Sequence, residues 1–539
     1  MTATLEAPAR ADATDGGDAK EPPQPARPVP AALAPWRDPH PWVGWLTLLL
    51  VTAVAAITRL WAIGFPHTKN FDEVYYANEA QELLRFGYED NRGYMFIVHP
   101  PLGKWLIALS EQYWHSRGGL DSIGWRLAPA IAGVISVVLI TRIVRRMLRS
   151  NLFGAIAGLL LALDGLSLVL SRTALLDIFL QTFVLAGFGA LVVDRDQVRA
   201  RLAGLIADGA DLSSGVPSLG PRPWRLVAGI MFGAACAVKW SALSYFVLFV
   251  LLSFVWDRAA LKTAGALQPT RNTVRRSLLP ASGSLLAAPL AVYLLSYLGW
   301  FTGENSWGRH YADTHSASTH LNLPLGIHLP FTWSWVPGPI RSLGSYTLNA
   351  YRFHEGLSSG HPYESSQWSW LVLGRPVDFS YNGSETTCGS STCAREILLI
   401  GTPLMWWAFV PALLWLAWHW FTTRDWRAGA VWVAFVAGWL VWFPDAKRTK
   451  FLFYMAPLVP FLIIAVTLGL GVMLGPALRR TGDFVRDRHS FRRRQWGMAG
   501  IAVYLGLVVI DFAWMWPIFT GGLLTFDNWH AHMWLPSWV

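Results

Sequence analysis

The chain has 539 residues, of which 53% are hydrophobic and 14% are charged, and its formal net charge is +10. Because the hydrophobic residues gather into runs long enough to cross a bilayer, a soluble multi-domain protein is excluded and an all-α polytopic membrane protein is predicted. The positive charge lies mainly between these runs, so it indicates topology and gives no reason to expect a nucleic-acid partner.

Residues 1–41 are rich in Ala, Pro and Asp and contain little that could pack, which predicts a disordered cytoplasmic tail. The first apolar run starts too late and is too long for a cleaved signal peptide, so we expect it to remain as the first membrane helix. About eleven runs are expected to cross the membrane: residues 42–62, 127–143, 152–170, 174–193, 226–238, 243–256, 278–301, 397–421, 428–443, 451–474 and 497–519.

Five of the segments between these runs are rich in Arg, and all five lie on one side if the chain crosses the membrane eleven times. Since short cytoplasmic loops retain positive charge, this pattern predicts a plasma-membrane protein with a cytoplasmic N-terminus and an extracytoplasmic C-terminus. One loop disagrees, because residues 445–450 carry Lys447, Arg448 and Lys450 on the outer side.

Two outer loops are too long to be simple connections, so we expect an extracytoplasmic active site there. In loop 63–126, apolar and polar residues alternate at helical spacing over residues 73–85 and 102–114, which predicts short helices at the membrane interface. Loop 302–396 is rich in His, Trp, Tyr, Gly and Pro, which suits an ordered, ligand-lined loop. It also contains Cys388 and Cys393, for which a local disulfide and two free thiols both stay open.

The predicted organisation has five parts. They are the tail over residues 1–41, an N-terminal membrane module over residues 42–301 that includes the first outer loop, the large outer loop over residues 302–396, a C-terminal membrane module over residues 397–520 and an outer tail over residues 521–539.

Two adjacent carboxylates, Asp72 and Glu73, stand just before the first interfacial helix. Neighbouring helix residues do not face each other, so separate roles are expected for the two groups. Asp72 is a candidate general base, and it is equally suited to cap the amino end of the helix.

Four cationic or titratable side chains are predicted at the same membrane face, namely Arg172, His99, Lys239 and Lys104. An ionisable group between apolar runs is costly unless it has a partner or a ligand, and a phosphate would suit these groups. The alternative is that Arg172 pairs with Asp177 or Asp72 and only holds helices together.

The carboxylate, the cations and the expected membrane setting together indicate transfer of a sugar from a lipid-linked donor. If the donor is a sugar on a polyprenyl monophosphate, the leaving group is already a stable anion, so cations replace a general acid and one carboxylate suffices as base. That base would take the proton from an acceptor hydroxyl while its oxygen attacks the anomeric carbon in line, which inverts the configuration.

Six motifs carry a resemblance to a known family. They are Phe71-Asp72-Glu73, His99-Pro100-Pro101-Leu102-Gly103-Lys104, Ser171-Arg172-Thr173-Ala174-Leu175-Leu176-Asp177, Val238-Lys239-Trp240-Ser241, the segment His361-Pro362-Tyr363-Glu364-Ser365-Ser366-Gln367-Trp368-Ser369-Trp370 and the segment from Arg448 to Pro457. In this order the set resembles the protein O-mannosyltransferases of the GT-C superfamily of membrane glycosyltransferases, and most closely their actinobacterial branch.

The resemblance implies polyprenyl-phosphate-mannose as donor and Ser or Thr of an exported protein as acceptor. It also implies that Asp72 is the catalytic base with Glu73 as its neighbour, and that Arg172 holds the donor phosphate in a region lined by His99 and Lys239. Loop 302–396 is too short for the β-trefoil domain of eukaryotic members, so their mode of acceptor binding does not carry over.

We further expect His361, Tyr363, Glu364 and Trp368, together with Asp177, to contact the acceptor or shape the mouth of the active site. Trp368 and His361 are the leading contacts, and a loop folded on its own aromatic residues is the alternative.

Two other functions stay open. A GT-C enzyme could use another lipid-linked sugar or another acceptor, such as a cell-wall glycan or a lipid. A secondary transporter would carry ionisable groups near the bilayer midplane and repeated halves, whereas here the charges gather at one face and no repeat is visible. No metal or cofactor is expected, because further carboxylates at ligand spacing are missing. Membrane lipid is an expected partner and a secretion channel a candidate one.

Overall fold

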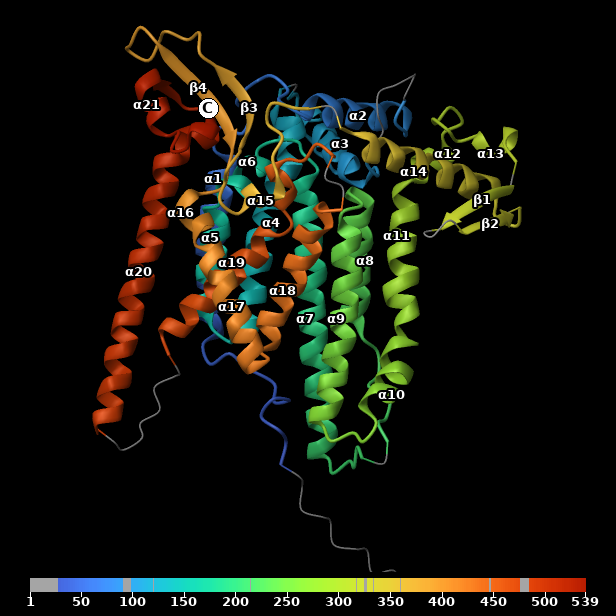
Figure 1. Cartoon of the computed structure of the whole chain (residues 1–539), viewed down its shortest axis with the longest axis vertical. Helices are drawn as coiled ribbons and strands as arrows, with labels where there is room; N and C mark the ends of the chain where they lie inside the picture. Colours follow the sequence, from blue (N-terminus) through green and yellow to red (C-terminus); the bar gives the residue numbers. More distant parts are fainter. Residues whose placement is uncertain are drawn as a thin grey trace, which may run out of the picture.

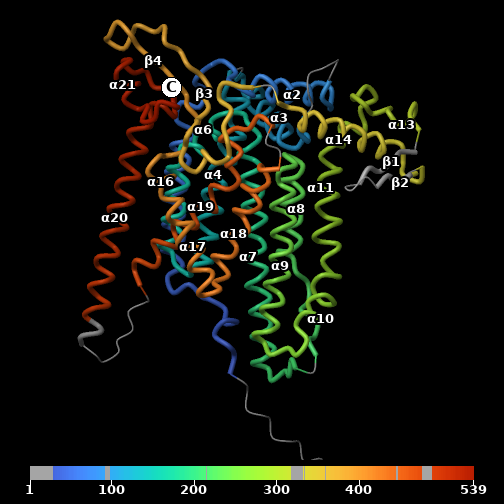
Figure 2. Tube along the Cα trace, viewed as in Figure 1, coloured from blue at the N-terminus to red at the C-terminus, as the bar shows by residue number. Residues whose placement is uncertain are grey.

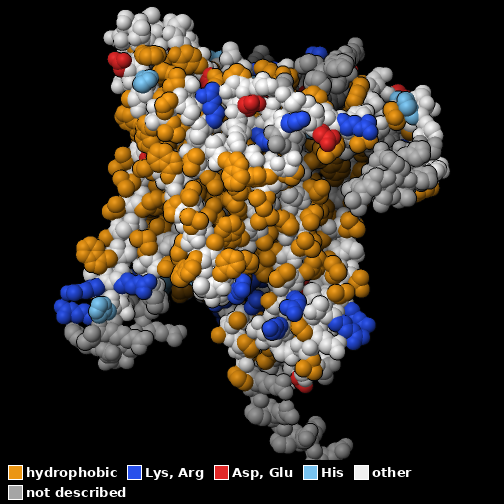
Figure 3. All heavy atoms as spheres, viewed as in Figure 1, with side chains coloured by type: hydrophobic (Ala, Val, Ile, Leu, Met, Phe, Trp, Pro, Cys, Tyr) orange, Lys and Arg blue, Asp and Glu red, His pale blue; other side chains and the backbone are white. Residues whose placement is uncertain are grey.

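A computed structural model describes residues 28–90, 98–119, 121–213, 215–316, 318–323, 327–332, 334–358, 360–444, 447–475 and 484–539. Most of the chain is a bundle of long helices, which run side by side in Figure 1. Hydrophobic side chains cover the middle of this bundle, and Lys and Arg gather toward its ends, as Figure 3 shows. This distribution is the one expected of a protein embedded in a bilayer.

Six helices in the described ranges are long and apolar enough to cross a membrane, and the number rises to eight if two bent pairs each count as one span. The six are α1 (Pro41–Leu60), α4 (Ile123–Leu148), α7 (Asp177–Ala207), α9 (Ala242–Thr263), α16 with α17 (Pro403–Trp407 and Phe409–Thr423) and α20 (Phe484–Thr520). The first bent pair is α5 (Asn151–Ala162) with α6 (Gly165–Ser171), and the second joins Pro269–Leu278 to Gly283–Ser296.

Three shorter apolar helices complete the bundle: α8 (Pro223–Val238), α18 (Trp426–Trp439) and α19 (Val459–Met473). Every predicted apolar run overlaps one of these helices or bent pairs, whereas the number of eleven membrane crossings stays a prediction. Two runs begin before their helices. The run predicted over residues 451–474 precedes α19, which starts at Val459, and the run predicted over residues 397–421 begins in strand β4, with its helix starting at Pro403. Proline suits the first turn of a helix, where its missing N–H would be unpaired anyway.

Both expected interfacial helices are present as α2 (Glu73–Phe86) and α3 (Leu102–His115). A third outer helix, α14 (Gly338–Gly356), lies with α2 across the ends of the long helices in Figure 1. The remaining short elements are α10 (Pro269–Thr273), α11 (Ala288–Ser296), α12 (Leu298–Thr302), α13 (Tyr311–Thr314), α15 (Gln367–Trp370) and the single-turn helices η1 (Val274–Leu278), η2 (Gly283–Ala287), η4 (Leu440–Trp442), η5 (Leu452–Met455) and η6 (Pro536–Trp538).

Two small antiparallel sheets outside the bundle of long helices were not predicted. One is the hairpin β1 (Ser318–Leu323) with β2 (Ile327–Thr332), and the other has the order β3 (Val377–Asn382), β4 (Cys393–Leu399), β5 (Leu523–Thr525). Cys388 and Cys393 form a disulfide in the connection between β3 and β4, which settles the open alternative in favour of the bridge.

The outer tail over residues 521–539 is folded. Its strand β5 pairs with β4, with Leu524 opposite Ala394, and α21 (Phe526–Ala531) follows directly. The C-terminus therefore lies beside this sheet, at the same end as α2 and α3, while the first described residues lie at the opposite end (Figure 2).

The prediction of a disordered tail over residues 1–41 is wrong for its described part, residues 28–41. Leu33 is only 1% exposed and packs in a hydrophobic cluster with Leu202 of α7 and Leu261 of α9. Asp38 forms an ion pair with Arg145 of α4, and this contact fixes the segment against the bundle. Residues 1–27 lie outside the described ranges.

Candidate active site

Asp72 immediately precedes α2, at the end of the bundle that carries the outer loops. Its side chain makes no capping hydrogen bond to the helix, so the capping role that the sequence allowed is absent. The carboxylate instead accepts a hydrogen bond from Tyr76, one turn along α2. The group is half-buried, and an aspartate whose oxygens are not used to cap a helix is available for chemistry.

The residue before Asp72 has a strained backbone. Phe71 has φ +49°, in the left-handed region that residues other than Gly rarely adopt. Its ring stacks on Phe379 at 4.9 Å and meets Phe453 and His361 edge-on at 5.8 and 6.1 Å. This packing holds the conformation, and strain of this kind is typical of functional sites.

Glu73, predicted beside Asp72 in the catalytic pair, has a different task. Its two oxygens accept hydrogen bonds of 2.8 Å from the guanidinium of Arg126, and they also accept the backbone N–H groups of Asn70 and Ala174 at 2.9 and 2.8 Å. Both side chains are buried. With its acceptor capacity used in this way, Glu73 is a positioning residue that joins loop 63–72 to α4 and to the turn before α7.

Lys239 and Asp177 form a buried ion pair with Nζ 2.6 Å from Oδ2. Asp177 was predicted to contact the acceptor or shape the mouth of the site, which stays a prediction; its side chain is buried, with 2% exposed. Lys239 lies at the end of α8, close enough to Asp72 to lower the pKa of that carboxyl. An ammonium group has three donors, so Lys239 retains hydrogen-bonding capacity beyond Asp177.

The structure places Arg172 against the end of α1. Its guanidinium donates to the carbonyl groups of Thr58, Arg59, Trp61 and Ala62. Since cations stabilise helix carboxyl ends, this geometry makes Arg172 a capping and positioning residue. The predicted contact of Arg172 with the donor phosphate stays a prediction, and among the described residues Arg172 forms no ion pair with Asp177 or Asp72.

Lys104 is also occupied. It is fully buried, and its Nζ lies 2.6 Å from Glu89 and 3.1 Å from Glu79. Burial raises the pKa of Glu89 to about 7, although the Lys104 cation opposes this rise. Lys104, which was predicted to bind phosphate, therefore takes part in buried ion pairs that link α3 to α2.

Two histidines and an arginine form a second group near Asp72. His99 stacks on His354 of α14 at 4.9 Å and lies 6.1 Å from the ring of Tyr76. Burial, followed by the Lys239 cation, holds the pKa of His99 well below its usual value, and burial lowers the pKa of His354 to about 4. Both imidazoles are thus neutral at pH 7 and serve as hydrogen-bonding groups.

Arg448 completes this group and was not among the predicted site residues. Its Nη2 lies 3.3 Å from Nδ1 of His354, and its guanidinium lies over the rings of Trp442 and Tyr454. A signal existed in the sequence, because residues 445–450 carry positive charge on the side where the charge rule predicts none.

The aromatic segment after α14 divides into two parts. His361 lies edge-on to Phe451 at 5.1 Å, and Tyr363 donates to Asp378 at 3.2 Å, so both face the group around Phe71. Trp368 is 68% exposed and packs edge-on against Trp439 and Phe443. Glu364 is exposed.

Trp368→Ala is expected to raise the apparent KM for an acceptor peptide severalfold and to leave the KM for the lipid donor unchanged, because an exposed indole offers stacking area at the surface. Steady-state kinetics with each substrate varied in turn will measure both values. Trp335→Ala removes another exposed outer tryptophan and serves as the control. A change in the donor KM alone would reject the acceptor assignment.

The surroundings of Asp72 predict an acidic limb in the pH–rate profile. Burial raises the pKa of Asp72 to about 6, and Lys239 opposes this rise while Asp177 adds to it. A base must be ionised, so kcat/KM should fall as pH drops below about 6. Lys239→Gln should move this limb to higher pH and Asp177→Asn should move it to lower pH, and shifts of the same sign would contradict the assignment of Asp72.

No group of three or more His, Cys, Asp or Glu side chains within the described ranges is placed to share a metal ion. A requirement for a metal stays open to assay by adding and removing a chelator.

Comparisons with known proteins agree with the motifs. The family model described as dolichyl-phosphate-mannose-protein mannosyltransferase matches residues 49–301, and the model of the C-terminal four-transmembrane region of protein O-mannosyltransferase matches residues 341–538. A polyprenol-phosphate-mannose–protein mannosyltransferase of Mycolicibacterium smegmatis is 42% identical over 92% of this chain and 93% of its own.

The same name belongs to a Mycobacterium tuberculosis protein, 40% identical over 96% of this chain and 97% of its own, and to a Corynebacterium glutamicum protein, 34% identical over 93% and 94%. The Saccharomyces cerevisiae Pmt1–Pmt2 complex bound to the sugar donor has a chain with a TM-score of 0.69, covering 92% of both chains at 15% identity. That likeness shows the predicted GT-C fold, and the matches together show that this chain belongs to the dolichyl-phosphate-mannose-protein mannosyltransferase family.

Proposed function

We propose that this protein transfers mannose from polyprenyl-phosphate-mannose to Ser or Thr hydroxyls of exported proteins, with inversion of configuration. The single observation that carries the mechanism is the position of Asp72, a carboxylate beside the cation Lys239 and free of any capping bond. The names of the relatives support the choice of donor and of a protein acceptor.

In this mechanism Asp72 accepts the proton of the acceptor hydroxyl as its oxygen bonds to the anomeric carbon. The bond between that carbon and the phosphate oxygen breaks, and its electron pair leaves with the polyprenyl phosphate. Lys239 and Arg448 are the cations placed to stabilise this anion. Arg172 and Lys104 are less suited, because Arg172 is bonded to carbonyl groups at the end of α1 and Lys104 lies between the carboxylates of Glu79 and Glu89. Neutral His99 is suited to hydrogen-bond the sugar or the phosphate. His354 instead orients Arg448, because its ring nitrogens are engaged by the carbonyl of Val98 and by the Arg448 guanidinium.

Purified protein in detergent or nanodiscs should transfer mannose to a Ser/Thr-containing peptide when polyprenyl-phosphate-mannose is supplied, and should not use GDP-mannose. Mass spectrometry identifies the mannosylated peptide, and cleavage of the product by an α-specific mannosidase shows that the new glycosidic bond has the α configuration. Transfer from GDP-mannose, or transfer of another lipid-linked sugar at an equal rate, would contradict the proposal.

We also propose that the N-terminus is cytoplasmic and that Asp72 faces the exterior of the plasma membrane, as the Arg-rich loops suggest. A single cysteine introduced at Ser537 in a Cys236→Ser background should react with an impermeant maleimide in intact cells, and one introduced at Lys20 should react only after lysis. The reverse pattern would invert the topology.

A further inference from the structure

A large cavity opens on the side of the bundle, away from Asp72. It has a volume of about 2230 Å³ and lies between α4, α7 and α8, with α3 at one end and the segment Ala31–Asp38 at the other. Several side chains of its wall are exposed at the protein surface, among them Leu109, Ile131 and Ile135. The cavity is therefore a lateral groove that is open toward lipid.

One stripe of α4 forms the apolar part of this groove. Ala128, Ile131, Ile135 and Leu139 follow at spacings of three and four residues and end at Arg142. The rise of an α-helix makes this stretch roughly 21 Å long, which exceeds half of a hydrocarbon core. Its length suits the acyl chains of a lipid whose headgroup lies at the Arg142 end.

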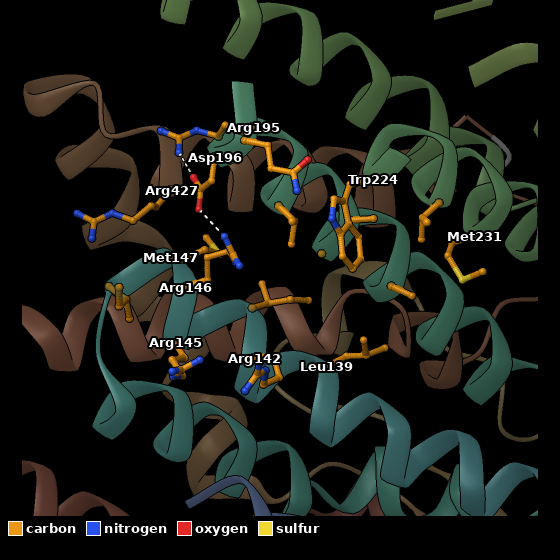
Figure 4. A pocket seen from close by; sticks show the side chains of 18 of the residues that line it. Leu139, Arg142, Arg145, Arg146, Met147, Arg195, Asp196, Trp224, Met231 and Arg427 are labelled. Atoms are coloured by element: carbon orange, nitrogen blue, oxygen red, sulfur yellow. Dashed lines mark hydrogen bonds and ion pairs between the residues drawn. The ribbon is translucent and has the colours of Figure 1, made fainter. Parts of the chain in front are cut away.

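The end of the groove opposite the outer loops is strongly cationic. Eight arginines and three aspartates line the cavity, an excess of five formal positive charges. Figure 4 shows the side chains of α4 and α7 around it, with Asp196 between Arg195 and Arg146. Three aspartates thus neutralise part of the cluster and leave a net positive site.

Arg142 of α4 and Arg149, the residue that follows this helix, have no carboxylate within ion-pair distance among the described residues. Arg142 lies over the ring of Trp45, with 4.5 Å from its guanidinium carbon to the ring centroid, and Arg149 donates to the carbonyl of Ala34 at 3.3 Å. A guanidinium retains several unused N–H donors after one such contact. Both residues line the cavity, so these donors are available to an anion that enters it.

We propose that this groove binds an acidic diacyl phospholipid from the leaflet opposite the active site. Its headgroup phosphate bonds to Arg142 and Arg149, and its acyl chains lie along the apolar stripe of α4. Basic pockets between membrane helices favour anionic headgroups, and guanidinium–phosphate bonds are charge-assisted. The segment Ala31–Asp38 closes the same end, so the bound lipid also holds the start of the chain against the bundle.

Native mass spectrometry of the full-length protein, titrated with phosphatidylglycerol and with phosphatidylcholine, tests the proposal. Wild-type protein should bind phosphatidylglycerol more tightly than phosphatidylcholine. Arg142→Gln with Arg149→Gln should weaken that binding by roughly tenfold or more, at about 1 kcal/mol per arginine. Arg275→Gln with Arg276→Gln removes the same charge from exposed positions of η1 outside the groove and should leave binding unchanged.

A second variant tests the apolar part without touching the charges. Ile135→Trp fills the groove from a half-exposed position, so it should weaken phosphatidylglycerol binding while the protein stays folded. Equal binding of the two phospholipids, or equal loss in the Arg142/Arg149 and Arg275/Arg276 variants, would overturn the site. Tighter binding of polyprenyl monophosphate than of phosphatidylglycerol would overturn the choice of ligand and assign the groove to the spent carrier.

Discussion

Asp72→Asn is expected to slow mannose transfer by at least about 100-fold, the low end for the loss of a general base, while the protein stays folded and binds its lipid donor. A Ser or Thr hydroxyl is far too weak an acid to ionise beforehand, so its proton must leave as the new bond forms. The asparagine amide has the shape of the carboxylate, but it is far too weak a base to accept the proton. Because Asp72 makes no capping bond, its replacement removes none from α2.

Single-turnover transfer and donor binding, measured on the same preparation, separate the two steps. Tyr76→Phe is the matched control, because it removes the hydrogen bond to Asp72 and leaves the base in place. That bond lowers the pKa of Asp72, so the acidic limb of the control should move to higher pH with only a modest loss of rate. Near-normal transfer by Asp72→Asn would remove this residue from the mechanism.

Local patterns in the sequence predicted the helices well. The two interfacial helices begin at Glu73 and Leu102, as expected, because an amphipathic pattern of period 3.6 depends only on neighbouring residues. The apolar runs likewise located the long helices, although several helices extend beyond their runs into polar residues, as α7 and α20 do. The exception was β4. A short run of apolar residues can form either a buried strand or a helix, and here the pairing with β3 and β5 determines that it forms a strand.

Partners of buried charges were not predictable. The sequence indicated that Arg172 and Lys104 each need a partner or a ligand, and phosphate was the natural assignment for both. The actual partners are the carbonyl groups at the end of α1 and the carboxylates of α2 and its following loop. These contacts depend on the tertiary fold, which brings residues more than a hundred positions apart into hydrogen-bonding distance in the case of Arg172.

Asp72 and Glu73 have different contacts in the structure. Their adjacency predicted separate roles, since neighbouring side chains on a helix diverge. The partner of Glu73 could not be predicted, because Arg126 lies 53 residues away in the sequence.

Glu73→Gln is expected to destabilise the protein by about 3–5 kcal/mol, the range for breaking a buried ion pair by removing one partner. Gln retains one acceptor but leaves the Arg126 cation, only 1% exposed, without its counter-charge. Thermal unfolding in detergent should show the loss, together with reduced transfer at temperatures where the protein is still folded.

Arg126→Gln and the double variant Glu73→Gln with Arg126→Gln distinguish positioning from catalysis. Removing both charges eliminates the unpaired cation, so part of the stability should return, as happens when a buried pair is replaced as a whole. Arg126 also donates to the carbonyl groups of Ile63, Pro66 and Thr68, so loop 63–72 is held by neither side chain in the double variant. If Glu73 acts by holding this loop, transfer should stay low in the double variant and in Arg126→Gln alone. Normal transfer by Arg126→Gln, which keeps the Glu73 carboxylate, would contradict the positioning role.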